Sequence, residues 1–190
     1  MKARIMLKAM ELMNKLGVKF TMSDLARELG VSKRALYENF LSKEDLVSAI
    51  TDAIHEDLRK QDREIMQRND LDLKEKIKMM LVAYPQALGP INDRVVYDIQ
   101  RYMPNQWKRT EHFLEEKWLN IFQLIQQGTA AGLLRPANIA IIQRVFTKAN
   151  SGLFDYQFLE QNRLSLKVAL EAMAELLVYG LETSSGPIDN

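Results

Sequence analysis

Residues 21–46, TMSDLARELGVSKRALYENFLSKEDL, determine how the N-terminal part of this chain is interpreted. Three segments in this stretch begin with a residue that can cap a helix N-terminus: Thr21, Ser32 and Ser42. Thr21 and Ser42 are each followed three positions later by an aspartate, as in a capping box that uses Asp in place of the usual Glu. Ser32 can cap a helix without such help. We therefore expect three short helices within this stretch.

The sequence leaves only a short turn, Gly30-Val31-Ser32, between the first two of these helices. Gly30 suits the left-handed conformation that ends a helix, because it has no Cβ. The segment before it is amphipathic, with apolar residues at Met22, Leu25, Ala26 and Leu29. Two short helices joined by a turn of about three residues form a helix-turn-helix.

The second helix of this pair has two distinct faces. Leu36 and Phe40 lie one turn apart and are expected to pack into the core. At 100° per residue, the opposite face carries four side chains: Lys33, Arg34, Tyr37 and Glu38. Lysine, arginine and tyrosine on an exposed helix are suited to phosphates and to the edges of guanine bases.

Composition is typical of a globular protein. The chain has 190 residues, 47% of them hydrophobic and 27% charged, which argues against disorder. It has no cysteine, which fits a reducing compartment, and no apolar run near the ~18 residues that a membrane span needs. We therefore expect a cytoplasmic protein without membrane association. Residues 1–48 carry nine Lys and Arg against six Asp and Glu, while the remainder carries 17 against 19. A mildly basic N-terminal segment followed by a mildly acidic remainder favours a polyanionic partner for the N-terminal segment.

The rest of the chain has helical periodicity throughout, with Gly and Pro mostly at breaks, which predicts an all-α protein of nine helices. A helix-turn-helix domain of three helices is expected in residues 1–48, and a helical ligand-binding and dimerisation domain in 49–190. The predicted helices outside the opening stretch cover about 4–16, 43–67, 73–88, 91–103, 106–131, 138–159 and 165–182.

Enzymatic and metal-binding patterns are missing from the sequence. His55-Glu56 lacks a second histidine four residues on, so the metalloprotease pattern fails. His112 with Glu115 or Glu116 offers fewer ligands than a zinc site requires. No phosphate-binding glycine loop, nucleophile elbow or dinucleotide fingerprint is present. We predict no catalytic residue, no metal and no cofactor.

The stretch LARELGVSKRALYENFLSKEDL closely resembles the DNA-binding segment of the tetracycline-repressor (TetR) family of bacterial transcription regulators. The resemblance is specific over about residues 4–50, through Thr-x-x-Asp-Leu-Ala, Gly-Val-Ser, Leu-Tyr-x-x-Phe and Lys-Glu-x-Leu. Over residues 51–190 it is architectural. It implies a nine-helix homodimer in which a small molecule bound in the C-terminal half changes the affinity for operator DNA, most often releasing a repressor.

The resemblance also implies roles for individual residues. Thr21 corresponds to a phosphate-contacting region, and Lys33 and Arg34 would read bases or adjacent phosphates. Tyr37 and Asn39 would contact the DNA backbone. Many family members have glycine where Arg34 stands, so no base preference is carried over. The predicted DNA-binding residues are Thr21, Ser32, Lys33, Arg34, Tyr37, Glu38, Asn39 and Lys43.

The C-terminal half supplies a predicted effector pocket and a predicted dimer interface. Bulky side chains and methionines on the helices over about 73–159 suggest a largely apolar pocket for a small hydrophobic or aromatic molecule. Its predicted lining residues are Tyr84, Tyr97, Arg101, His112, Trp118, Asn150, Phe154 and Asp155. The last two helices carry more apolar surface than one neighbour would cover, which predicts a homodimer through about 138–182 and a palindromic operator.

Two other hypotheses remain open from sequence. One is an all-helical binding or scaffolding protein whose helix-turn-helix contacts another protein. The other is an enzyme on a helical scaffold. Salt-sensitive binding to random duplex DNA separates the first interpretation from both of these.

Overall fold

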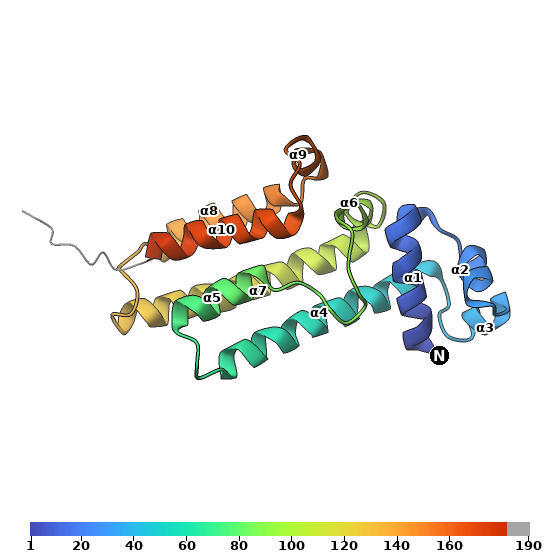
Figure 1. Cartoon of the computed structure of the whole chain (residues 1–190), viewed down its shortest axis with the longest axis horizontal. Coiled ribbons are helices and arrows are strands. Elements are labelled where there is room, and N and C mark those ends of the chain that lie inside the picture. The colour runs from blue at the N-terminus through green and yellow to red at the C-terminus, as the bar shows by residue number, and fades with distance from the viewer. Residues whose placement is uncertain (182–190) are drawn as a thin grey trace, which may run out of the picture. The chain divides into compact units, whose positions relative to one another are not determined.

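The computed structural model describes residues 1–181, except for the side chains of residues 150 and 151. Within that range it contains no strand, so the all-α prediction is confirmed. Figure 1 labels the α-helices. The elements are α1 (Lys2–Leu16), η1 (Gly17–Lys19), α2 (Met22–Leu29), α3 (Lys33–Tyr37), α4 (Lys43–Gln67), α5 (Leu73–Val82), α6 (Asp93–Tyr102), α7 (Pro104–Ala130), α8 (Ile139–Leu153), α9 (Tyr156–Gln161) and α10 (Leu166–Leu181).

The chain forms two compact units. The first unit comprises Met1–Lys60 and Tyr84–Phe113, and therefore holds α1, η1, α2, α3, α6 and the N-terminal parts of α4 and α7. The second comprises Gln61–Ala83 and the chain from Leu114 onward, and holds α5, α8, α9, α10 and the C-terminal parts of α4 and α7. The predicted division into a DNA-binding domain, residues 1–48, and a ligand-binding and dimerisation domain, residues 49–190, concerns function. It stays a prediction.

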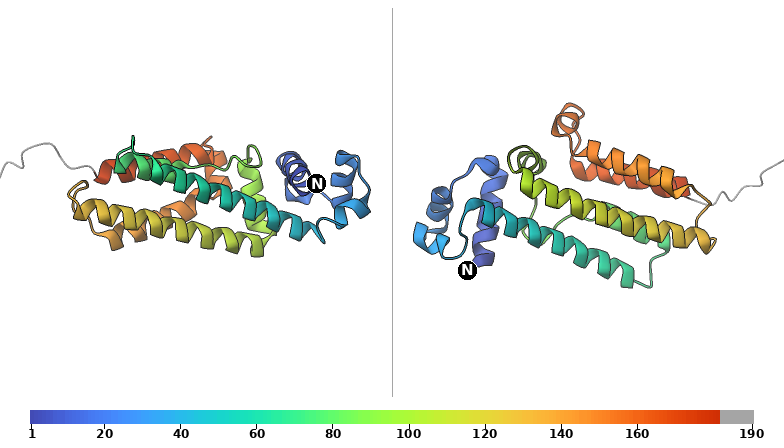
Figure 2. Two further views of the ribbon diagram at one scale, coloured as in Figure 1. Left: turned by 90° about the horizontal axis from the view of Figure 1, so that it is seen from below. Right: turned by 180° about the vertical axis from the view of Figure 1, so that it is seen from behind.

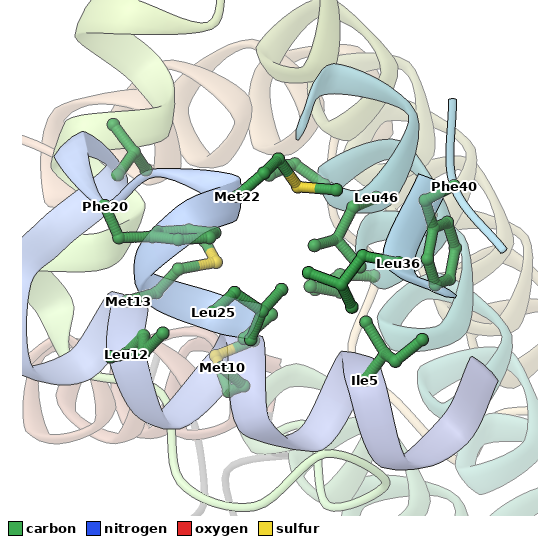
Figure 3. Close-up of a cluster of buried hydrophobic side chains, with 14 of the residues drawn as sticks. Ile5, Met10, Leu12, Met13, Phe20, Met22, Leu25, Leu36, Phe40 and Leu46 are labelled. Carbon is green, nitrogen blue, oxygen red and sulfur yellow. The ribbon is translucent and has the colours of Figure 1, made fainter. Parts of the chain in front are cut away.

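The core of the first unit is formed by α1, α2, α3 and the start of α4. Leu25, Leu36 and Leu46, one from each of the last three helices, are 0% exposed. Figure 3 shows their side chains converging with those of Ile5 and Met10 from α1. Because α2 and α3 are too short to be stable alone, this shared core is what holds the helix-turn-helix in place.

The core of the second unit is built mainly by α5, α7 and α10. Ile77, Ile121 and Ile125 are almost fully buried, and α10 contributes Ala174 and Leu177 to the same cluster. The helix α10 packs against both α5 and α8, and Figure 2 shows α8 and α10 side by side. The two C-terminal helices thus share one layer of this unit.

Two helices end earlier than the sequence predicted. Helix α5 stops at Val82 rather than near residue 88, because the residue before Pro85 is disfavoured in helical conformation. Helix α8 stops at Leu153 rather than near residue 159. Asp155 then accepts hydrogen bonds from the backbone N–H groups of Gln157 and Phe158 and starts a separate helix, α9. This cap raises the number of α-helices in residues 1–181 from the predicted nine to ten.

Within residues 1–181, none of the helices combines the length and the apolar character that crossing a membrane requires.

Candidate nucleic-acid interface

The first helix of the pair begins with the predicted capping box. The Thr21 hydroxyl accepts a hydrogen bond from the Asp24 backbone N–H at 3.1 Å, and the Asp24 carboxylate accepts one from the Thr21 backbone N–H at 2.9 Å. Hydrogen bonds from the Thr21 hydroxyl and backbone lower the pKa of Asp24 below its ordinary value. The Thr21 side chain is exposed, so it is accessible to a phosphate while it caps α2.

The turn between α2 and α3 is fixed by the residues that the sequence indicated. Gly30 adopts the left-handed conformation, with φ 66° and ψ 33°, and nothing lies within 4 Å of the position that a Cβ would take. The Val31 N–H donates to the Ala26 carbonyl at 3.0 Å. The Ser32 hydroxyl then accepts from the Ala35 N–H at 3.1 Å and starts α3. The turn is therefore fixed by a backbone hydrogen bond at its first end and by the Ser32 side-chain cap at its second.

Helix α3 presents the predicted outward face to solvent. Leu36 and Phe40 are 0% and 3% exposed, which confirms them as packing residues. The opposite face is exposed and carries Lys33, Arg34, Tyr37 and Glu38.

One ion pair lies on this face. Arg34 Nε lies 3.2 Å from Glu38 Oε1, with side chains that are 90% and 62% exposed. Such a pair on a helix surface contributes only about 0.2–0.5 kcal/mol, so the guanidinium remains available to a base or phosphate.

Asn39 and Lys43 make internal contacts in this structure. The Asn39 side-chain amide donates to the Ala35 carbonyl at 2.8 Å. Lys43 Nζ donates to the Val18 carbonyl and lies 5.0 Å from the centre of the Phe20 ring. Burial lowers the pKa of the Lys43 ammonium, and the neighbouring Glu44 carboxylate opposes this. An ammonium has three donors, so the bond to Val18 leaves Lys43 able to bind a phosphate as well.

Three cations near the helix-turn-helix were not singled out from sequence. Arg4 donates to the Leu29 carbonyl at 3.3 Å, at the end of α2. Lys2 lies 5.5 Å from the centre of the Phe40 ring. Lys19 lies 5.2 Å from the centre of the Tyr102 ring. Tertiary packing decides which aromatic ring a lysine covers. The sequence therefore indicated these cations only through the basic character of residues 1–48.

Four of the predicted effector residues fall in the first unit. Tyr84 is half-buried and donates to the Ile91 carbonyl at 2.9 Å, and burial raises its pKa to about 12. Arg101 is exposed, donates to the Tyr97 hydroxyl at 2.6 Å and stacks on both Tyr97 and Tyr102. His112 is exposed on α7. These side chains have contacts of their own in the first unit, and effector binding by them stays a prediction.

The other predicted effector residues fall in the second unit. Trp118 is 5% exposed and stacks on Phe122, with 5.2 Å between ring centres. Phe154 is half-buried and packs against the cluster around Leu159. Asp155 is the N-cap of α9, which accounts for a polar residue at this position. The Asn150 side chain lies outside the described residues. The predicted set is thus divided between the two units, and effector binding by it stays a prediction.

The second unit contains a buried ion pair that sequence reasoning missed. Lys117 Nζ lies 2.6 Å from both carboxylate oxygens of Asp62, and the two side chains are only 10% and 16% exposed. Burial raises the pKa of Asp62 and lowers that of Lys117, while each charge opposes the shift of the other. The two residues are 55 positions apart in the sequence, so no local pattern indicated their pairing.

Metal-binding geometry is not found in the described part of the chain, where no three His, Cys, Asp or Glu side chains gather around one point. His55 is 6% exposed and stacks on Phe113 with 4.3 Å between ring centres. Its burial against an aromatic ring is consistent with a packing role.

Comparison with known proteins identifies the helix-turn-helix. Residues 5–50 match the family described as "Bacterial regulatory proteins, tetR family". Over 181 residues, covering 95% of both chains, the protein is 26% identical to "Uncharacterized HTH-type transcriptional regulator YvaF" of Bacillus subtilis (strain 168).

Solved structures share the whole fold. The TetR family transcriptional regulator PfmR from Thermus thermophilus has a TM-score of 0.68 and 22% identity, over 95% of this chain and 100% of that one. The transcriptional regulator FadR from Bacillus subtilis, in complex with stearoyl-CoA, has a TM-score of 0.61 and 15% identity, over 94% of this chain and 98% of that one. At these identities the two structures establish the fold alone. The helix-turn-helix segment, residues 5–50, thus matches the tetracycline-repressor family of bacterial transcription regulators, and the whole chain shares the fold of solved structures from that family.

Proposed function

We propose that this regulator is a ligand-responsive repressor that binds a palindromic operator as a homodimer and leaves it when a small hydrophobic molecule binds. DNA binding is assigned to residues 1–48, and effector binding and dimerisation to residues 49–190. The observation that carries the proposal is the α3 surface, on which Lys33, Arg34 and Tyr37 are exposed while capped ends and a buried Leu36 hold the helix in place.

Dimerisation is supported by an outward apolar stripe on each of the two C-terminal helices. Along α8 the exposed positions include Ile141 and Val145, which are 61% and 54% exposed. Along α10 they include Leu176 and Tyr179, each 72% exposed, one and two turns beyond the exposed Ala172. Because α8 and α10 pack side by side, two copies of this surface can form a four-helix bundle about a two-fold axis.

The effector is proposed to be apolar because of the side chains in the second unit. Trp118, Phe122 and Phe146 form an aromatic cluster, with 6.2 Å between the ring centres of Trp118 and Phe146. The complex of FadR with stearoyl-CoA is an example of this fold that holds a molecule with a long acyl chain. Coupling is proposed to run along α4, since this single helix begins at Lys43 beside the DNA-binding surface and contributes to both units.

The DNA-binding assignment is tested on the preferred site selected from a random duplex library. Arg34→Ala should weaken binding to that site by about 1–3 kcal/mol if Arg34 reads a base edge. Lys43→Ala should weaken specific and random duplexes alike and reduce the salt slope by about one unit, because it contacts phosphate. Arg68→Ala is the matched control, since this exposed arginine lies in the second unit and outside the proposed dimer surface.

Three results would contradict parts of the proposal. If the parent protein binds no duplex at low salt, the helix-turn-helix does not serve DNA binding, and protein contact becomes the better interpretation. If Arg34→Ala behaves like Arg68→Ala, the recognition surface is misassigned. For the effector, acyl-CoA and other hydrophobic compounds are titrated against the protein–operator complex while operator affinity and thermal stability are followed. Compounds that stabilise the protein without changing operator affinity would leave a constitutive DNA-binding protein, because a ligand with equal affinity for both states shifts nothing.

A further inference from the structure

A buried carboxylate on α6 holds the link between α1 and α2. Asp98 is 6% exposed, and its Oδ2 accepts a hydrogen bond from the Val18 backbone N–H at 3.1 Å. A carboxylate in such a position is stable only with hydrogen-bond donors around it. No motif in the sequence singles out Asp98, which stands between Tyr97 and Ile99 on an amphipathic helix.

Gly17 makes this approach possible. It adopts φ 68°, and a Cβ at this position would lie 2.0 Å from Asp98 Oδ2. A side chain would therefore displace the carboxylate in addition to straining the backbone. A second contact between α1 and the segment before α6 reinforces the arrangement: the Asn14 side chain donates to the Pro90 carbonyl at 2.7 Å and accepts from the Asn92 N–H at 2.9 Å.

The next peptide group along the chain, on the other side of the Val18 Cα, is held by Lys43. Asp98 accepts from the Val18 N–H, while the Val18 carbonyl accepts from the Lys43 ammonium at the start of α4. Val18 thus connects a carboxylate on α6 with a lysine of the proposed DNA-binding surface. The two bonds lie on the two peptide groups that flank the Val18 Cα, so the bond from Asp98 restricts the backbone that positions the Val18 carbonyl.

Lys43 has room to leave this position. It lines a cavity of about 470 Å³ together with Lys19, Glu44 and Tyr102. A lysine side chain has high rotamer entropy, so without a fixed acceptor it would spread through this space. The position of the Val18 carbonyl therefore decides how much of the time Lys43 Nζ stays at the N-terminus of α4.

We propose that Asp98 is a positioning residue for DNA binding, which fixes the backbone at Val18 so that the Val18 carbonyl aims Lys43 at a DNA phosphate. This inference rests on the proposed function, in which Lys43 contacts phosphate. In this arrangement α6 influences DNA affinity through two hydrogen bonds, one between Asp98 and Val18 and one between Val18 and Lys43.

The test measures the affinity of the full-length protein for a random-sequence duplex over a range of salt concentrations. Asp98→Ala removes the acceptor and should reduce the salt slope by about one unit. At 0.1 M salt the loss of one phosphate contact corresponds to about 8-fold weaker binding. Gly17→Ala should have a similar effect on the slope without changing net charge, because its Cβ displaces the carboxylate. Asp98→Asn retains an oxygen acceptor and should restore most of the parent's slope.

The sign of the effect distinguishes positioning from simple electrostatics. Removing a negative charge ordinarily strengthens binding to DNA. Asp93→Asn, on the same helix, is the control and should leave affinity unchanged or raise it. Circular dichroism at the assay temperature confirms that each variant is folded, and Gly17→Ala still tests the inference if Asp98→Ala is not.

A double mutant gives the decisive comparison. In the Lys43→Ala background, Asp98→Ala should cause no further loss of slope. If Lys43→Ala alone reduces the slope but Asp98→Ala and Gly17→Ala do not, the positioning role is wrong while the proposed function stands. An additional loss in the double mutant also overturns it, since Asp98 would then act through another contact. A parent protein without duplex affinity would instead defeat the proposed function itself.

Discussion

The exposed stripe on α10 makes a quantitative prediction about assembly. Leu176 on α10 is 72% exposed. Leu176→Ala removes three carbon atoms, each worth about 0.8 kcal/mol when fully buried. Scaled by the exposed fraction of 72%, burial in a dimer stabilises each copy by about 1.7 kcal/mol. A two-fold interface contains the residue twice, so the substitution should cost about 3.5 kcal/mol, or about 300-fold in the dimer dissociation constant.

The assay is a dilution series followed by sedimentation equilibrium, which gives the dissociation constant of parent and variant under one condition. Leu119→Ala is the matched control, because Leu119 is 52% exposed on α7 of the same unit and lies on neither stripe. It should leave the dissociation constant unchanged within about threefold, since one exposed leucine outside the interface contributes little to association.

The reasoning is refuted in either of two ways. A parent protein that is monomeric at micromolar concentration has no interface for Leu176 to stabilise. A stable dimer that tolerates Leu176→Ala as well as Leu119→Ala has its interface elsewhere. In both cases the outward stripes on α8 and α10 would need another explanation.

Three further predictions concern stability. Asp62→Ala should destabilise the protein by about 3–5 kcal/mol in urea denaturation, because it leaves the Lys117 charge buried without its partner. The double replacement Asp62→Leu with Lys117→Met should be neutral or stabilising. Equal losses of unfolding free energy in the two variants would contradict this prediction. Tyr84 has a folded pKa of about 12 against an ordinary value of 10.0, so its stabilising contribution is complete below pH 10 and is lost as pH rises through about 12. Ultraviolet titration should show one late-ionising tyrosine that Tyr84→Phe removes. Gly30→Ala should lower the stability measured by thermal unfolding by about 1–2 kcal/mol. The whole loss should come from the left-handed backbone conformation, because no atom lies close to the position of the Cβ. A larger loss of stability would mean that a steric clash contributes.

Local sequence determined the helix-turn-helix. Its caps at Thr21 and Ser32, its turn at Gly30 and its buried Leu36 were all predicted correctly, since each depends on residues no more than four positions apart. The family resemblance came from the same stretch, and the match to residues 5–50 confirms it. Helix boundaries were less accurate where a local signal was overlooked, as at Pro85 after α5 and at the Asp155 cap of α9.

Tertiary structure alone decided the pairings between distant residues. Nothing near Asp98 in the sequence predicts its bond to Val18, which lies 80 positions away, or the ion pair of Asp62 with Lys117. It also decided which apolar residues of α10 face outward: Leu177 is 2% exposed, and its neighbour Leu176 is 72% exposed. Helical periodicity assigns residues to faces but does not say what covers each face, because that depends on which helices pack against it.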